Sequence, residues 1–166
     1  MNHASAIPGV RLHPLQWWHI SACAAIDEQV FPDSAWSEET FWSELARVPD
    51  SRYYLVAIRD SEREGDDGVV VGYAGLACVP PDADVQTIAL APEAQGMGLG
   101  SVLLGELIAE SRRRGCTSLI LEVAADNSTA IALYEKSGFE LLSRRRDYYA
   151  PGRDALIMRR RERVDS

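Results

Sequence analysis

A glycine-rich turn at residues 95–100, with the sequence QGMGLG, carries the strongest chemical signal in this chain of 166 residues. Glycine has no side chain to block a ligand, so successive backbone N–H groups can point at one anion. The apolar periodicity of residues 98–114 predicts a long helix directly after the turn, and helix N-termini bind phosphate. The P-loop is excluded because it needs Gly-Lys-Ser/Thr, whereas Gly100 is followed by Ser101 and Val102. The dinucleotide-binding fingerprint is excluded because it needs a glycine at position 101. Three glycines in five positions exceed the needs of a ligand-free turn, so we expect an anion site.

Two further side chains could move protons. Glu122 is an acid within the apolar segment 117–123, where a carboxylate must be paired or reach water. It could accept a proton from an amine, or it could be a strand-end acid that meets solvent. Tyr134 follows it by 12 residues. Its phenol could donate a proton, although packing is the commoner use of a tyrosine on a short helix. Cys116 suggests an acyl-enzyme nucleophile, but no histidine lies near it in sequence, and we interpret it as a structural thiol.

Composition narrows the class of protein. With 46% apolar residues, the chain can bury one core without disulfides or a structural metal. A net charge of −8 argues against binding nucleic acid or an anionic membrane by bulk charge. The three cysteines form no C-x-x-C unit and the three histidines lack metal spacing, so we expect reduced thiols and no metal. No signal peptide or membrane-spanning run is recognised, and we expect a cytoplasmic protein without direct nucleic-acid or membrane binding.

The elements that must position these residues follow the order ααβββαβαββ. A helix is expected from Pro14, with Leu15, Trp18 and Ile26 on its buried face, and Ser37 is expected to cap the next one. The second helix should bury Phe41, Trp42, Leu45 and Val48. Strands are expected at 53–58, 69–79, 85–90, 117–123, 139–149 and 155–160, and a short helix capped by Asn127 or Ser128 should end at Gly138. This order predicts one mixed α/β domain over residues 1–166.

The glycine turn and its surroundings resemble the GCN5-related N-acetyltransferase (GNAT) superfamily. The acetyl-CoA motif of that family is Q/R-x-x-G-x-G/A, and Gln95, Gly98 and Gly100 match it. The segment TIALAPEAQ leads into this motif, and LEVAADN, ALYEKSGF and RRRDYY come after it, all in the family's order. These segments are most similar to the bacterial ribosomal-protein-alanine N-acetyltransferases. The resemblance covers residues 85–160 well. It implies an α+β domain with its core at about 10–160, a mixed, mostly antiparallel sheet flanked by helices, and acetyl-CoA as co-substrate.

The resemblance also implies roles for individual residues. Glu122 is the expected general base and Tyr134 the expected general acid. Residues 144–149 are expected to border a peptide groove, with Phe31 and Trp36 opposite; a solvated strand face and a pair of core aromatics are the respective alternatives. Alanine at 124 and glycine at 96 stand where relatives often have arginine. The backbone donors of the loop survive either change, whereas the change at position 124 affects the contacts on the peptide side. The residues expected to contact acetyl-CoA are Ile88, Ala89, Leu90, Gly96, Met97, Gly98, Leu99, Gly100, Ser101 and Asn127.

The reaction implied is acetyl transfer to the N-terminal α-amine of a protein, expected to be a ribosomal protein that begins with alanine. The amine would attack the thioester directly in a ternary complex. The same chemistry on a lysine side chain or a small amine is the close alternative. A non-catalytic sensor that binds acyl-CoA is the alternative of a different class, and the presence of both Glu122 and Tyr134 weighs against it.

Overall fold

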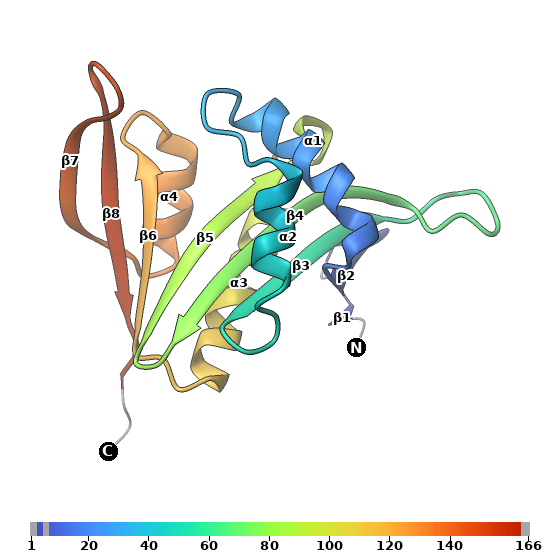
Figure 1. Ribbon diagram of the computed structural model, residues 1–166, viewed down its shortest axis with the longest axis horizontal. Coiled ribbons are helices and arrows are strands. Elements are labelled where there is room, and N and C mark those ends of the chain that lie inside the picture. The colour runs from blue at the N-terminus through green and yellow to red at the C-terminus, as the bar shows by residue number, and fades with distance from the viewer. Residues whose placement is uncertain (1–2, 5–6, 164–166) are drawn as a thin grey trace. The chain divides into compact units, whose positions relative to one another are not determined.

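The computed structural model describes residues 3–4 and 7–163 of the chain (Figure 1). In that part, eight strands form one mixed sheet in the order β1-β2-β3-β4-β5-β6-β8-β7. The elements are β1 His3–Ala4, β2 Val10–Pro14, the 3-10 turn η1 Trp17–His19, α1 Ile20–Val30, α2 Glu38–Leu45, β3 Arg52–Arg59, β4 Val69–Val79, β5 Asp82–Leu90, the 3-10 turn η2 Pro92–Ala94, α3 Leu99–Arg113, β6 Ser118–Ala124, α4 Ser128–Lys136, β7 Glu140–Ala150 and β8 Arg153–Arg161. The predicted mixed, mostly antiparallel sheet with flanking helices is confirmed.

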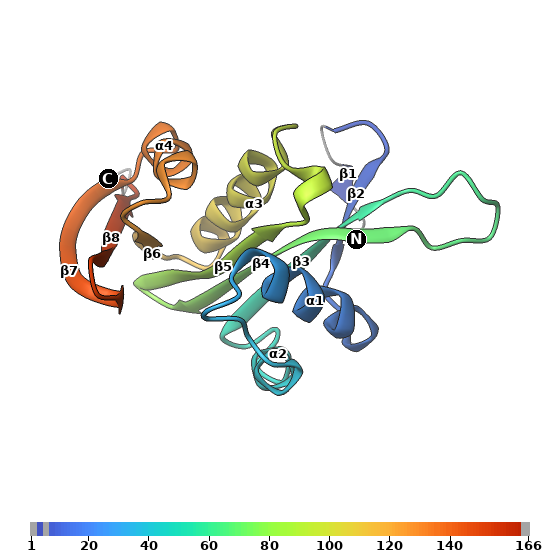
Figure 2. The ribbon, with the colours of Figure 1, turned by 90° about the horizontal axis from the view of Figure 1, so that it is seen from above.

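The chain divides into two compact units. The first contains the described residues up to Gly75 together with Thr87–Leu107, and the second contains Leu76–Gln86 together with the residues from Ile108 onward. In the first unit, Tyr54, Leu55, Val56 and Ala57 are all buried, which is typical of a strand covered on both faces. Figure 2 shows the reason: α1 and α2 lie on one face of this part of the sheet, and the N-terminal half of α3 lies on the other.

The prediction for the N-terminal segment was wrong in one respect. Pro14 does not begin a helix but ends strand β2, which pairs antiparallel with β3 from Val10↔Arg59 to Pro14↔Leu55. The helix α1 begins only at Ile20, and Trp18, expected on the buried face, is 58% exposed. The physical reason is tertiary, because a strand of five residues is stable only when a neighbouring strand satisfies its backbone. The observed order therefore begins with strands that the sequence pattern did not reveal.

The second helix forms as predicted, although less of it is buried. Ser37 caps α2, and its Oγ accepts a hydrogen bond from the backbone N–H of Thr40 at 3.2 Å. Phe41 is buried, but Trp42 is half exposed and Val48 is also exposed. The helix therefore anchors through one aromatic side chain rather than through a continuous apolar face.

In the second unit, β6 lies between β5 and β8. The β5–β6 pair is parallel and runs from Asp82↔Ser118 to Val85↔Leu121, so the chain must cross over between the two strands, which it does through α3. The β6–β8 pair is antiparallel over Ser118↔Arg161 to Ala124↔Ala155. Every residue of the edge strand β7 is exposed. Because the β5–β6 pairing ends at Val85↔Leu121, Glu122 is the first residue of β6 beyond it.

Candidate functional site

The glycine turn in the first unit has the backbone that an anion site requires. Gly96 and Gly98 have φ angles of +81° and +87°, in the left-handed region that favours glycine. A Cβ added at either position would meet no heavy atom within 4 Å. The two glycines are therefore needed for their conformation and for an open surface, and not because neighbouring atoms crowd them.

Short contacts hold this turn between β5 and α3. The side-chain Nε2 of Gln95 donates to the backbone oxygen of Leu90 at 3.2 Å, so the glutamine of the motif braces the turn. The backbone N–H of Val102 donates to the oxygen of Gly98 at 3.3 Å. The N–H groups that precede Val102 at a helix start have no acceptor within the helix. Ala89 and Leu99 have buried side chains, so any contact they make with a ligand must come from the backbone.

Glu122 in the second unit lies on β6, opposite Ile157 of β8, with its side chain exposed. Although the residue is exposed, the atoms around the carboxyl desolvate it and raise its pKa above its usual range; the charge of Arg145 lowers this pKa, and the charge of Asp84 raises it. Among the described residues, no ion pair involves Glu122. An acid at the end of a strand with a raised pKa and no salt bridge can accept a proton.

Tyr134 lies on α4, where its ring packs edge-on against Phe139 with 5.9 Å between the ring centroids. Burial raises the pKa of its phenol to about 12, and Tyr149 contributes to the increase. The hydroxyl therefore remains protonated at neutral pH and is available as a hydrogen-bond donor.

Tyr149 on β7 joins these two residues electrostatically, which the sequence did not indicate. Although Tyr149 is exposed by surface area, desolvation of its phenol by neighbouring atoms raises its pKa, and the charge of Glu122 raises that pKa further. The register of β7 and β8 shifts between Arg145 and Ala150, and Asp147 within this irregular stretch has a φ of 53°. Such bulges redirect side chains. Glu122 thus acts on Tyr149, and Tyr149 acts on Tyr134, so that side chains from β6, β7 and α4 form one electrostatically linked cluster. The RRRDYY motif was the sequence signal for Tyr149.

Asn127 has a structural use that is visible without any ligand. Its Oδ1 accepts the backbone N–H of Ala130 at 3.2 Å and caps α4, so that of the two predicted caps, Asn127 and Ser128, the structure uses Asn127. The amide NH₂ of this exposed residue is left for another acceptor. Cys116 is buried, and its thiol donates to the backbone oxygen of Asp82 at 3.5 Å, which fits the structural interpretation.

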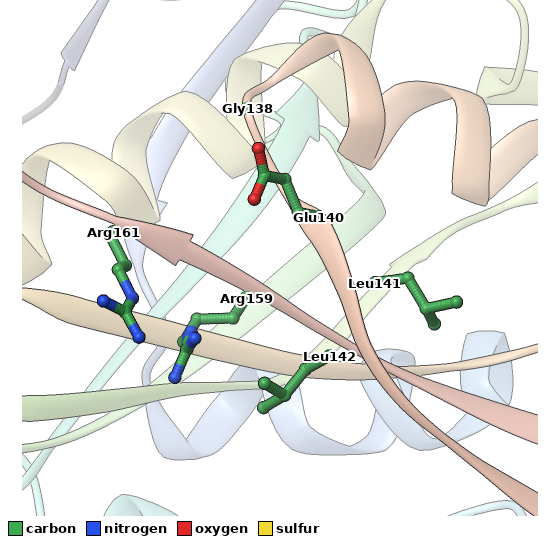
Figure 3. Close-up of a pocket in the computed structure, with 6 residues that line it drawn as sticks. All are labelled: Gly138, Glu140, Leu141, Leu142, Arg159 and Arg161. Carbon is green, nitrogen blue, oxygen red and sulfur yellow. The ribbon is translucent and has the colours of Figure 1, made fainter.

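Two further observations concern the remaining surface of the described chain. A hollow in the second unit is lined by β7 and β8, where Arg159 and Arg161 extend from the same face of β8 (Figure 3). It contains none of the predicted site residues. Within residues 3–4 and 7–163, no group of three or more His, Cys, Asp and Glu side chains could hold a metal, and no helix is long and apolar enough to span a membrane.

The structure thus distributes the predicted residues over both units. Residues 88–101, with the glycine turn, belong to the first unit. Glu122, Asn127 and Tyr134 belong to the second. In the first unit, the open turn at a helix N-terminus has the backbone donors that a phosphate-bearing ligand needs. In the second unit, a carboxylate with a raised pKa is able to accept a proton.

Comparison with known proteins identifies the family. Residues 15–139 match the model of the "Acetyltransferase (GNAT) family", and the chain belongs to this family. It is 40% identical over 144 residues to the N-alpha-acetyltransferase RimI of Mycobacterium tuberculosis, which covers 83% of this chain and 84% of the relative. The crystal structure of the ribosomal-protein-S18-alanine N-acetyltransferase from Escherichia coli superposes with a TM-score of 0.79 at 31% identity, covering 95% of this chain and 96% of the other.

A longer relative also matches. The chain is 40% identical over 147 residues to the uncharacterized protein ML0378 of Mycobacterium leprae, which covers 85% of this chain. The chain spans only 38% of the length of that relative.

Proposed function

We propose that the protein transfers the acetyl group of acetyl-CoA to the N-terminal α-amine of a protein, and that a ribosomal protein beginning with alanine is its substrate. The observation that carries this proposal is the electrostatic linkage of Glu122, Tyr149 and Tyr134: the charge of Glu122 raises the pKa of Tyr149, and Tyr149 raises the pKa of Tyr134. The names of the relatives from M. tuberculosis and E. coli point to the same reaction. A ribosomal substrate would place the reaction in the cytoplasm.

The glycine turn is the proposed site for the pyrophosphate of the co-substrate. Its open surface at Gly96 and Gly98 fits a group that a Cβ would displace. The backbone N–H groups from Gly98 to Ser101 would donate to the phosphate oxygens at the positive end of α3. Met97 is 46% exposed and can cover the same group. We assign the backbone of residues 88–90 to the pantetheine arm and the amide of Asn127 to a further contact. When bound, acetyl-CoA supplies an acyl group activated as a thioester.

Glu122 is the proposed base. Its raised pKa makes the carboxylate a better proton acceptor than an ordinary surface acid. An α-amine has a pKa of about 8 and needs only modest help to lose its proton, whereas a lysine amine at about 10.4 needs more. A single carboxylate, acting directly or through water, therefore suits an α-amine better than a lysine side chain.

Tyr134 is the proposed hydrogen-bond donor to the leaving sulfur. A phenol with a pKa of about 12 is a weaker acid than a thiol, whose pKa is about 8.5. We infer that Tyr134 donates a hydrogen bond as negative charge develops on the sulfur. Because the hydroxyl stays protonated across the physiological range, this donor is present at every pH at which the base works.

The acceptor peptide has two proposed contact segments. In the second unit, Arg145 and Tyr148 make a cation–π contact at 5.4 Å, and Arg153 lies 5.5 Å from the ring of Tyr149. Arginine and tyrosine in this arrangement suit a peptide backbone or an acidic side chain. In the first unit, the proposed segment is the exposed α1–α2 loop, which has Phe31 at its start and Trp36 near its end.

An acetylation screen tests the proposal. Peptides that vary in their first four residues are incubated with enzyme and acetyl-CoA, and the modified amine is located by mass spectrometry. We expect turnover on α-amines, highest after alanine. A matched peptide with a blocked N-terminus and one free lysine separates the lysine alternative. Binding of acetyl-CoA without turnover on any amine would instead support the sensor.

A further inference from the structure

Asp27 is a buried acid that the proposed reaction does not use. It lies in the last turn of α1 and is 2% exposed. Among the described residues, no cation forms an ion pair with it. Burial of a carboxylate is costly, and the C-terminal end of a helix repels negative charge. Because burial and the helix C-terminus both disfavour a carboxylate at this position, its hydrogen bonds must stabilise it there.

Each oxygen of the Asp27 carboxylate has its own donor. The backbone N–H of Trp36 donates to Oδ2 at 2.6 Å, and the hydroxyl of Tyr73 on β4 donates to Oδ1. The hydroxyl of Thr87 on β5 in turn lies 3.5 Å from the Tyr73 oxygen. Hydrogen bonds to an ionised group are stronger than neutral ones, especially when buried. One side chain therefore ties the end of the α1–α2 loop to two strands of the first unit.

In the middle of the loop, the structure shows one local turn, in which the backbone N–H of Ser34 donates to the oxygen of Phe31 at 3.1 Å. The backbone N–H of Phe31 donates to the oxygen of Asp27 at 2.7 Å, which fixes the start of the loop. Residues 32–35 are exposed. At the far end of the loop, the ring of Trp36 packs against Phe41 with 5.4 Å between the ring centroids, and Phe41 packs against Tyr73 with 5.3 Å between theirs. Asp27 thus holds both ends of the loop, the first through its backbone and the second through its side chain.

We propose that Asp27 is a positioning residue that sets the conformation of loop 31–37 for the acceptor amine. This inference rests on the proposed function, in which the loop borders the acceptor peptide. Asp27 would not touch either substrate. Its carboxylate would act through the Trp36 backbone, so its loss would weaken use of the peptide and leave the glycine turn, and hence acetyl-CoA binding, unchanged.

The test compares Asp27→Ala with Asp27→Asn and with Glu28→Ala, a control at the exposed acid next to it on α1. Hydrogen exchange of the Trp36 amide, followed by NMR, reports directly on the bond to Asp27. Initial rates give kcat and KM for an alanine-first peptide, and calorimetry gives the Kd for acetyl-CoA. For Asp27→Ala we expect at least tenfold faster exchange and at least a tenfold higher peptide KM, with kcat and the acetyl-CoA Kd within twofold. Glu28→Ala should match the wild type.

Asp27→Asn should restore most of the peptide KM. Its amide oxygen can accept the Trp36 N–H, and its NH₂ can donate to the Tyr73 oxygen. If Asp27→Ala does not fold, Tyr73→Phe is used instead, because it removes the hydroxyl donor to Asp27 and keeps the bond from Trp36. The proposal then requires a rise in peptide KM smaller than the tenfold expected for Asp27→Ala, with the acetyl-CoA Kd unchanged. Unchanged peptide KM in these variants, or parallel loss of acetyl-CoA affinity, would overturn it. If the wild type acetylates no peptide, the proposed function fails, while Trp36 exchange still decides whether Asp27 holds the loop.

Discussion

Gly98 and Gly115 stand at the two ends of α3 and share one backbone conformation. Their φ angles are +87° and +81°, and a Cβ at either would meet no heavy atom within 4 Å. Gly98 lies in the turn proposed for the pyrophosphate, whereas Gly115 lies in the connection to β6. Aspartate substitutions at the two positions therefore impose the same strain while placing a carboxylate either at the proposed anion site or away from it.

The expected stabilities can be worked out from this geometry. A side chain at positive φ costs about 1–2 kcal/mol, and the stiffer unfolded chain returns about 0.4–1 kcal/mol, so the net loss is about 1 kcal/mol at each position. A carboxylate gains about 0.3–1 kcal/mol at a helix N-terminus and loses as much at the C-terminus. Each kcal/mol shifts the Tm of a domain this size by about 2–4 °C. We expect a Tm drop of about 0–3 °C for Gly98→Asp and about 3–8 °C for Gly115→Asp.

Acetyl-CoA affinity should follow the opposite order. A carboxylate at position 98 would repel the pyrophosphate and occupy the open surface beside the backbone donors, so its Kd should rise at least tenfold, or about 1.4 kcal/mol. Gly115→Asp should bind acetyl-CoA like the wild type, although it is the less stable variant. Thermal unfolding and isothermal calorimetry measure the two quantities. A wild-type Kd for folded Gly98→Asp, or equal weakening in both variants, would refute the assignment of the turn.

Three further predictions concern the cluster in the second unit. Glu122→Gln should lower kcat by roughly 10²–10⁴ with the acetyl-CoA Kd nearly unchanged, and activity within threefold of the wild type across pH 6 to 9 would reduce Glu122 to a strand-end acid. Activity should fall as the pH drops through the Glu122 pKa, because the base must be deprotonated. Arg145 lowers that pKa, so Arg145→Ala should move the acidic limb of the kcat/KM profile to higher pH. An unmoved limb would contradict this prediction. Tyr134→Phe should lower kcat rather than either affinity, and by less with an acyl donor whose leaving thiol is more acidic; equal defects with both donors would leave the ring only a packing role.

Several features were predictable because the residues that decide them are close in sequence. The boundaries of β4 match the apolar run 69–79, and α3 follows its leucine stripe to within one residue at each end. The caps at Ser37 and Asn127 each accept a hydrogen bond from the backbone N–H of the residue three positions later. The positive φ angles of the glycine turn follow from the lack of a Cβ. Periodicity, caps and glycine conformation are local properties, and a single sequence displays them.

Other features depend on partners far along the chain. Strand β2 owes its existence to β3, more than 40 residues later. Tyr149 lies beyond the regular β7–β8 register, and the charge of Glu122, from a strand 27 residues earlier in the chain, raises its pKa. The bond between Asp27 and Tyr73 spans 46 residues. Nothing in the local pattern distinguishes this acid from its exposed neighbour Glu28.

The sequence by itself determined the helix with its glycine turn, the order of the elements from α1 onward, and the acid and phenol available for chemistry. The tertiary structure alone decided which of these side chains share one electrostatic environment, and which acid is buried to hold a loop. The physical reason is that turns and caps are satisfied within a few residues. The pKa of a carboxyl and the strength of a buried hydrogen bond depend instead on every group that folding brings around them.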